Sequence, residues 1–179
     1  SVIQYFLPLY LLTAVDDGGL GKDELTVGFF LAGAQVAGVV AQPIMGWLSD
    51  NHGRKVVLVP AMTLLGILYI TLSISSDGYP LLLNILFMGA FVYSLHTIFI
   101  AAAMDVALGK AQSTVVSLIY GASFIGTVSP IIAGLLVDAF GLTSAFVYSG
   151  IIVLSSTVVL IGLRLPKTMS QEINVQLKS

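Results

Sequence analysis

The sequence contains no cysteine and very few charged residues. Of its 179 residues, 57% are hydrophobic and only 9% are Asp, Glu, Lys or Arg, whereas soluble domains carry about 25% charged residues. Without cysteine there is no disulfide framework, no thiol nucleophile and no cysteine-based metal site. The scarcity of charge, with a mean hydropathy of +1.01, predicts a membrane-embedded chain and gives no reason to expect a nucleic-acid partner.

Catalytic signatures are also missing from the sequence. It has no nucleophile elbow, no phosphate-binding loop and no His/Asp cluster with metal-ligand spacing. We therefore expect neither an enzyme nor a bound cofactor, and an ATP-driven pump would need a nucleotide site that this sequence lacks. The first residues have neither the basic region nor the cleavage site of a signal peptide, so we assign them to a membrane helix.

Long apolar runs alternate with short polar breaks along the chain. A helix needs roughly 20 residues to cross the hydrocarbon core at about 1.5 Å per residue. Only the first run, of about 15 residues, is too short for this, and we expect its beginning to lie outside this chain. We predict an all-α membrane protein with a six-helix transmembrane bundle over residues 1–164 and a short polar tail over 165–179. The six runs are residues 1–15, 25–48, 56–74, 81–104, 113–137 and 143–163.

Basic residues concentrate in alternate breaks between these runs. Six of the seven fall on one predicted side of the membrane, which leaves only Lys22 on the other. By the positive-inside rule this side is cytoplasmic, as are both ends of the segment, in a cell membrane. Asp105, at the end of the fourth run, is expected to be a solvated or paired charge on the same side. The six basic residues are Arg54, Lys55, Lys110, Arg164, Lys167 and Lys178.

The break between the second and third runs, GWLSDNHGRK, holds the most specific pattern in the chain. Gly53 can take the positive-φ conformation that a tight turn between helices requires. Asp50 can accept hydrogen bonds from the N–H groups at a helix N-terminus. Arg54 and Lys55 can meet carboxylates or lipid phosphates at the interface. The alternative is a solvated loop whose basic residues only anchor the chain.

This loop resembles a cytoplasmic loop of major facilitator superfamily transporters, Gly-x-Leu-(Ser/Ala)-Asp-basic-x-Gly-Arg-basic. Asn51 departs from that pattern, because the family usually has Arg or Lys there. The resemblance implies one six-helix half of a major facilitator fold, the second of two, with the other half as its partner. It also implies that the loop gates conformational change through Gly46, Asp50, Gly53, Arg54 and Lys55. The matching residues are Gly46, Leu48, Ser49, Asp50, Gly53, Arg54 and Lys55.

Polar side chains inside the predicted helices are candidates for a substrate or proton site, because such groups are costly in hydrocarbon. Gln35 and Gln42 are seven residues apart and share a helix face, where they bind either solute or another helix. His96 follows Tyr93 by one turn, and histidine gains and loses a proton near neutral pH. The alternative for His96 is a neutral ring bonded to a neighbouring hydroxyl. Tyr120 is a further candidate of the same kind.

The resemblance implies a secondary active transporter that moves a small solute by alternating access with energy from an ion gradient. The alternative is a membrane receptor or scaffold that uses the same bundle without transport. The sequence does not separate symport from antiport, because solute contacts come from both halves. The partners we expect are a small-molecule solute, the lipid bilayer and the other six-helix half.

Overall fold

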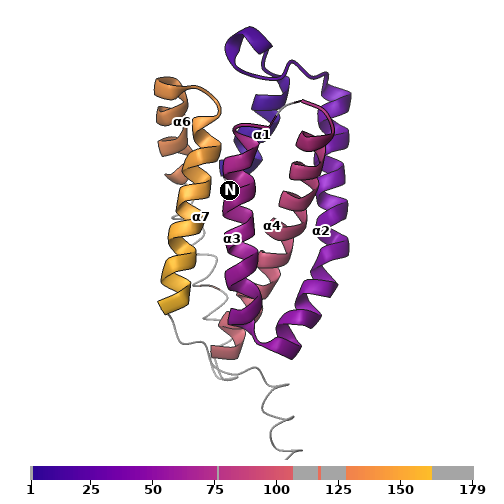
Figure 1. The fold of residues 1–179 in the computed structure, drawn as a ribbon, viewed down its shortest axis with the longest axis vertical. Helices are drawn as coiled ribbons and strands as arrows, with labels where there is room; N and C mark the ends of the chain where they lie inside the picture. Colours follow the sequence, from indigo (N-terminus) through magenta and orange to yellow (C-terminus); the bar gives the residue numbers. More distant parts are fainter. Residues whose placement is uncertain (1, 76, 107–116, 118–127, 163–179) are drawn as a thin grey trace, which may run out of the picture.

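The computed structural model describes residues 2–75, 77–106, 117 and 128–162, and all regular structure in these segments is helical (Figure 1). This confirms the all-α prediction for the described part of the chain. The elements are α1 (Val2–Leu12), the short 3-10 helix η1 (Val15–Asp17), α2 (Glu24–His52), α3 (Arg54–Leu72), α4 (Tyr79–Val106), α6 (Ser129–Phe140) and α7 (Ser144–Gly162).

Four of the described helices, α2, α3, α4 and α7, are long and apolar enough to cross a membrane. The other two α-helices, α1 and α6, are shorter, with 11 and 12 residues. Most of the fifth predicted run and the whole 165–179 tail lie outside the described residues. The total of six spans therefore stays a prediction.

Local chemistry sets both ends of α2. At the start, the Asp23 carboxylate accepts hydrogen bonds from the Thr26 hydroxyl at 2.6 Å and the Thr26 backbone N–H at 3.1 Å, as an N-cap residue does. These bonds favour the ionised form and lower the pKa of Asp23. At the other end, Gly53 has φ +99° and its N–H bonds the Ser49 carbonyl, which confirms the predicted positive-φ turn.

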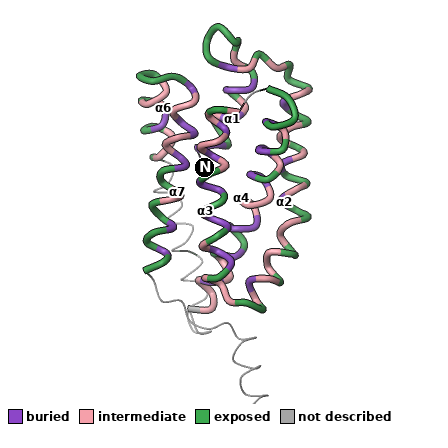
Figure 2. The backbone as a smooth tube through the Cα atoms, viewed as in Figure 1, coloured by how far each residue is buried: buried purple, intermediate pink, exposed green. Residues whose placement is uncertain are grey.

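The long helices pack in two close pairs, α2 with α4 and α3 with α7, and α3 joins the pairs by also packing on α4 (Figure 1). Figure 2 shows the buried residues on the faces that the helices turn toward one another. The rings of Tyr10 and Phe146 meet edge to face, with centroids 5.1 Å apart. Large apolar side chains such as Phe29, Val36 and Trp47 remain exposed on α2, as an apolar surrounding permits.

Small residues bring the paired helices into backbone contact. A Cβ on Gly89 would lie 2.3 Å from the Ala34 carbonyl oxygen, where α2 crosses α4. A Cβ on Gly150 would lie 2.9 Å from the Gly66 carbonyl oxygen, where α3 crosses α7. Close crossings through small residues are a common way for membrane helices to associate. Ala34 and Gly38, two small residues one turn apart on α2, are both buried.

Two polar clusters lie at opposite ends of the bundle. One surrounds the α2–α3 turn at the bottom of Figure 1, and the other joins the 13–23 loop to the 73–78 turn at the top. In the latter, the Lys22 ammonium forms an ion pair with the Asp77 carboxylate. The Lys22 hydrogen bond lowers the pKa of Asp77. Lys22, the one basic residue on its predicted side, thus ties two loops together.

Candidate functional site

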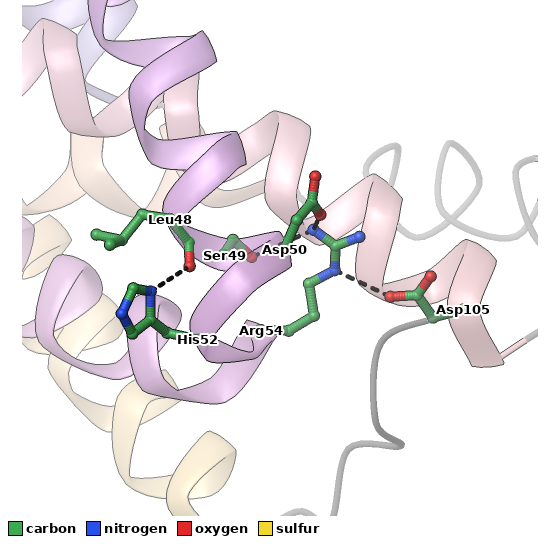
Figure 3. A network of polar contacts seen from close by, with 6 residues as sticks. All are labelled: Leu48, Ser49, Asp50, His52, Arg54 and Asp105. Carbon is green, nitrogen blue, oxygen red and sulfur yellow. Dashed lines mark hydrogen bonds and ion pairs between the residues drawn. The ribbon is translucent and has the colours of Figure 1, made fainter. Parts of the chain in front are cut away.

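The α2–α3 turn forms a polar network centred on Arg54, the first residue of α3 (Figure 3). Arg54 Nε donates a hydrogen bond to Asp105 Oδ2 at 2.9 Å. Arg54 Nη1 donates to Ser49 Oγ at 3.2 Å and also to Asp50 Oδ1. The guanidinium therefore joins the end of α2, the start of α3 and the end of α4.

Burial differs sharply among the charged members of this network. The Arg54 side chain is 11% exposed, Asp105 is 22% exposed and Asp50 is 50% exposed. A guanidinium removed from water needs carboxylate partners, and its planar fork can serve two of them at once. Asp105 is thus the inner partner of Arg54, and Asp50 presents half of its side-chain surface to the surroundings.

Sequence reasoning identified Asp50 and Arg54 but did not assign their partners. Asp105 was expected to be a solvated or paired charge, and the structure shows that it is paired with Arg54. The role of Ser49 was missed, because a serine within a matching motif carries no separate signal. One signal was available for Asp105, since it is an acidic residue at the helix end nearest to Arg54.

Lys55 has a different kind of partner from Arg54. Its ammonium donates to the backbone carbonyl of Ile161 in the last turn of α7. The sequence led us to expect carboxylates or lipid phosphates. That expectation stays a prediction. α7 packs along α3, which brings the Ile161 carbonyl beside the first turn of α3. A cation is favoured at this negative end of a helix.

His52, which lies in the same stretch of sequence, points away from the charge network (Figure 3). His52 Nδ1 lies 3.2 Å from the Leu48 carbonyl oxygen, so its ring folds back on α2 (Figure 3). A Cβ on Gly46 would meet no other atom of the described structure within 4 Å. Gly46 therefore leaves open space beside α2, one turn before Asp50.

A cavity of about 310 Å³ lies between α1, α2 and α4, away from the ends of α2 and α4. Its walls are mostly apolar, and the described residues that line it include no charged side chain. Two amides and two phenols supply the polar side-chain groups of the lining. A pocket of this kind suits an apolar molecule that makes a few hydrogen bonds. The lining residues are Ile3, Gln4, Leu7, Pro8, Leu31, Ala34, Gln35, Tyr69, Met88, Gly89, Val92 and Tyr93.

The predicted substrate and proton residues divide into three groups. Gln35 and Tyr93 both line the cavity. Gln42 is partly buried and His96 is exposed, and neither belongs to the lining. Tyr120 lies outside the described residues. The structure therefore brings two of the five candidates to one site, and the function of all five stays a prediction.

The cavity also contains residues that the sequence did not single out. Tyr69 of α3 and Met88 of α4 both line it. Each lies in an apolar run where tyrosine or methionine is ordinary core composition, so no sequence signal marked them. Gln4 of α1 also lines the cavity.

Comparison with known proteins gives one family and several relatives. The family model described as Major Facilitator Superfamily matches residues 1–177. A "Multi-drug resistance efflux pump PmrA homolog" of Lactococcus lactis subsp. lactis (strain IL1403) is 30% identical over 165 residues, which cover 90% of this chain and 39% of that protein. "Multidrug resistance protein MdtG" of Proteus mirabilis (strain HI4320) is 29% identical over 154 residues, 82% of this chain and 36% of that protein.

The chain spans about two-fifths of the length of the curated relatives it matches. No solved structure gives a significant match. Neither the family nor these relatives are enzymes, in agreement with the expectation from the sequence. Together with the four apolar helices, the matches identify an integral membrane protein.

Proposed function

The chain belongs to the major facilitator superfamily, and on this premise we propose that it is one half of a secondary active transporter. It forms a six-helix bundle, the second of two, and moves a small solute by alternating access. The chain ends and the Arg54 end of the bundle face the cytoplasm of a cell membrane. The observation that carries the proposal is the Arg54 network, which places a half-exposed carboxylate on a mostly buried, paired guanidinium.

In this proposal Asp50 is a latch between the two halves. Arg54 donates a hydrogen bond to the Asp50 carboxylate. The Asp105 carboxylate also accepts a hydrogen bond from Arg54, and its negative charge balances the positive charge of the guanidinium. The exposed side of Asp50 then bonds a helix end of the other half in one conformational state only. The open space beside Gly46 supports this arrangement, since a helix of the other half can approach α2 there.

The solute binds in the cavity between α1, α2 and α4 and is a small lipophilic molecule. Two observations support this: the apolar, uncharged lining, and the names of the relatives, which describe multidrug resistance and efflux. Gln35 and Tyr93 orient the solute by hydrogen bonding. The direction is export, coupled to an ion or proton gradient, and His96, one turn beyond Tyr93, is the candidate proton carrier.

A receptor or scaffold of the same architecture is the alternative, and one experiment separates it from a transporter. The complete protein that contains this segment is expressed in cells lacking their own efflux pumps, and loss of a preloaded lipophilic dye is followed. Transport predicts efflux that stops when the proton and ion gradients are collapsed, and that is weakened by Asp50→Asn. Asp138→Asn, which changes an exposed carboxylate on α6, is the matched control. Dye retention equal to that of cells without the protein would favour the scaffold.

A further inference from the structure

Gly38 of α2 and Tyr93 of α4 meet beside the cavity that lies between α1, α2 and α4. A Cβ on Gly38 would lie 2.5 Å from Tyr93 Cδ2 and 2.9 Å from Tyr93 Cβ and Cγ. These separations are well below van der Waals contact in a close-packed interior. At this level of α2, only glycine leaves room for the Tyr93 ring in the position that the structure shows.

The two helices have little freedom to move apart and accept a larger residue. One turn along the same interface, a Cβ on Gly89 would lie 2.3 Å from the Ala34 carbonyl oxygen, so the two backbones are already in contact. Ala34, Gly89 and Tyr93 all line the cavity. The crossing of α2 and α4 is therefore also part of the cavity wall.

We propose that Gly38 is a positioning residue that sets the solute selectivity of the cavity by fixing the Tyr93 ring in its wall. This inference rests on the proposed function, because it takes the cavity to be the solute site. A methyl group at position 38 displaces the ring, and a shift of the ring changes both the shape of the wall and the direction of the phenol hydroxyl. Gly38 itself touches no solute and acts only through Tyr93.

The same wall indicates which solutes are selected. Tyr69 and Tyr93 offer aromatic rings, Met88 offers a polarisable thioether, and Gln4 and Gln35 offer amides. Aromatic rings favour other aromatic rings in offset or edge-to-face contact, and thioethers also favour ring edges. Because no charged side chain lies among the described lining residues, an uncharged flat aromatic solute fits this half of the site best.

The test compares two solutes in the complete transporter. Nile red is uncharged, flat and aromatic, whereas tetraphenylphosphonium is cationic and not flat. We expect Gly38→Ala to change the ratio of the two KM values by about tenfold, as one methyl group in a pocket commonly does. Maximal rates should stay within about twofold, because the residue acts on binding and not on the conformational cycle.

Two further variants separate positioning from simple packing. Gly28→Ala changes a glycine of the same helix that has no neighbouring atom within 4 Å, and it should leave the KM ratio unchanged. Tyr93→Leu removes the ring, and in that background Gly38→Ala should have no further effect on the ratio. An unchanged ratio in a folded Gly38→Ala protein overturns the inference, as does an undiminished effect in the Tyr93→Leu background.

Failure of the proposed function gives a different result. If the wild-type protein moves neither solute, the transporter proposal fails, and binding of Nile red to the purified protein then decides the inference. A Kd that changes in Gly38→Ala but not in Gly28→Ala supports positioning of Tyr93. Equal Kd values in the wild-type and Gly38→Ala proteins contradict it.

Discussion

Arg54 is the residue on which the polar network at the α2–α3 turn depends. It is the least exposed of the three charged groups, and its hydrogen bonds reach Ser49, Asp50 and Asp105. A planar guanidinium can direct separate N–H groups at partners that lie in different directions, whereas a lysine ammonium is a compact point charge on a flexible stem. The arrangement therefore requires arginine and not merely a positive charge.

We accordingly expect Arg54→Lys to destabilise the protein although the charge is kept. Arg54 reaches its partners from two nitrogens, Nε and Nη1, whereas the three N–H donors of an ammonium share one nitrogen position. We therefore expect a partly buried carboxylate to lose its partner, at a cost of about 1–3 kcal/mol. Thermal unfolding of the detergent-solubilised protein measures this. Lys55→Arg is the matched control, because a cation at that position still reaches the end of α7. Equal melting temperatures for wild type and Arg54→Lys would show that the guanidinium geometry does not contribute to stability.

Asp77 allows a prediction at acidic pH. Its pKa is lowered by the hydrogen bond from Lys22, so its stabilising effect is fully present above its unfolded pKa of about 3.9 and is lost as the pH falls through the lower folded pKa. The pair is largely exposed, with 50% of the Asp77 side chain accessible, and solvent screening limits its contribution to about 1 kcal/mol or less.

The measurement compares the unfolding free energy of wild type and Asp77→Asn across pH. A small difference should be present at neutral pH and should vanish in strong acid. Asp16→Asn, which changes another carboxylate in the loops at this end of the bundle, serves as the matched control for loss of a negative charge. A difference between wild type and Asp77→Asn that grows toward acid pH would contradict the assigned sign.

Among the helices, α3 and α7 form one of the two close pairs, and their crossing is the contact that holds this pair together. Gly66 and Gly150 face each other there, and Leu154 and Ile70 close over them. The contact is reinforced at one end by Lys55, whose ammonium bonds the Ile161 carbonyl. The N-terminal turn of α3 thus carries both Arg54 of the candidate gate and the residue that holds the end of α7.

We predict that Gly150→Val separates α3 from α7. The new Cβ would lie 2.6 Å from Ile70 Cγ1 and 2.9 Å from the Gly66 oxygen, and overpacking of this kind costs about 1–3 kcal/mol. Gly134→Val on α6 is the control, because a Cβ there meets no atom within 4 Å. Unfolding midpoints of the two variants decide the matter. If the two midpoints fall by the same amount, the loss of stability comes from placing valine in a helix and not from disruption of the α3–α7 crossing.

For the complete transporter, the proposed Asp50 latch affects the balance between two conformations. If its contact with the other half exists in one state only, its loss shifts the balance between inward- and outward-facing forms. The expected shift is about 1–3 kcal/mol, the range for charge-assisted hydrogen bonds. Spin labels on the cytoplasmic ends of the two halves report it through their distance distribution in wild type and Asp50→Asn.

Asn51→Arg is the companion variant, because it restores the family pattern next to Asp50 and should be tolerated. Asp138→Asn, on α6 at the opposite end of the bundle, should leave the distances unchanged. Identical distance distributions in wild type and Asp50→Asn would contradict the latch. The loop would then serve only to anchor the chain at the membrane surface. Solute contacts in the cavity are expected to survive Asp50→Asn, since the two sites occupy different levels of α2.

Four properties follow from the sequence alone: the membrane class, the positions of the long helices, the Gly53 turn and the family. Each of these depends on local properties: run length, hydropathy, the permitted φ of glycine, and the order of residues in one loop. Positions of the predicted runs 25–48, 56–74, 81–104 and 143–163 agree with α2, α3, α4 and α7 to within a few residues, because the hydrocarbon thickness constrains both.

The contacts between residues far apart in the chain follow from the packing of the helices and not from the sequence alone. Asp105 reaches Arg54 across 51 positions of sequence, and Lys55 reaches Ile161 across 106; neither pairing follows from hydropathy, which is alike on every apolar helix. The cavity lining and the Gly38–Tyr93 contact depend on how α2 and α4 rotate and cross. That geometry is set by close packing of small and large side chains between helices, a property of pairs of helices that the periodicity of a single helix does not encode.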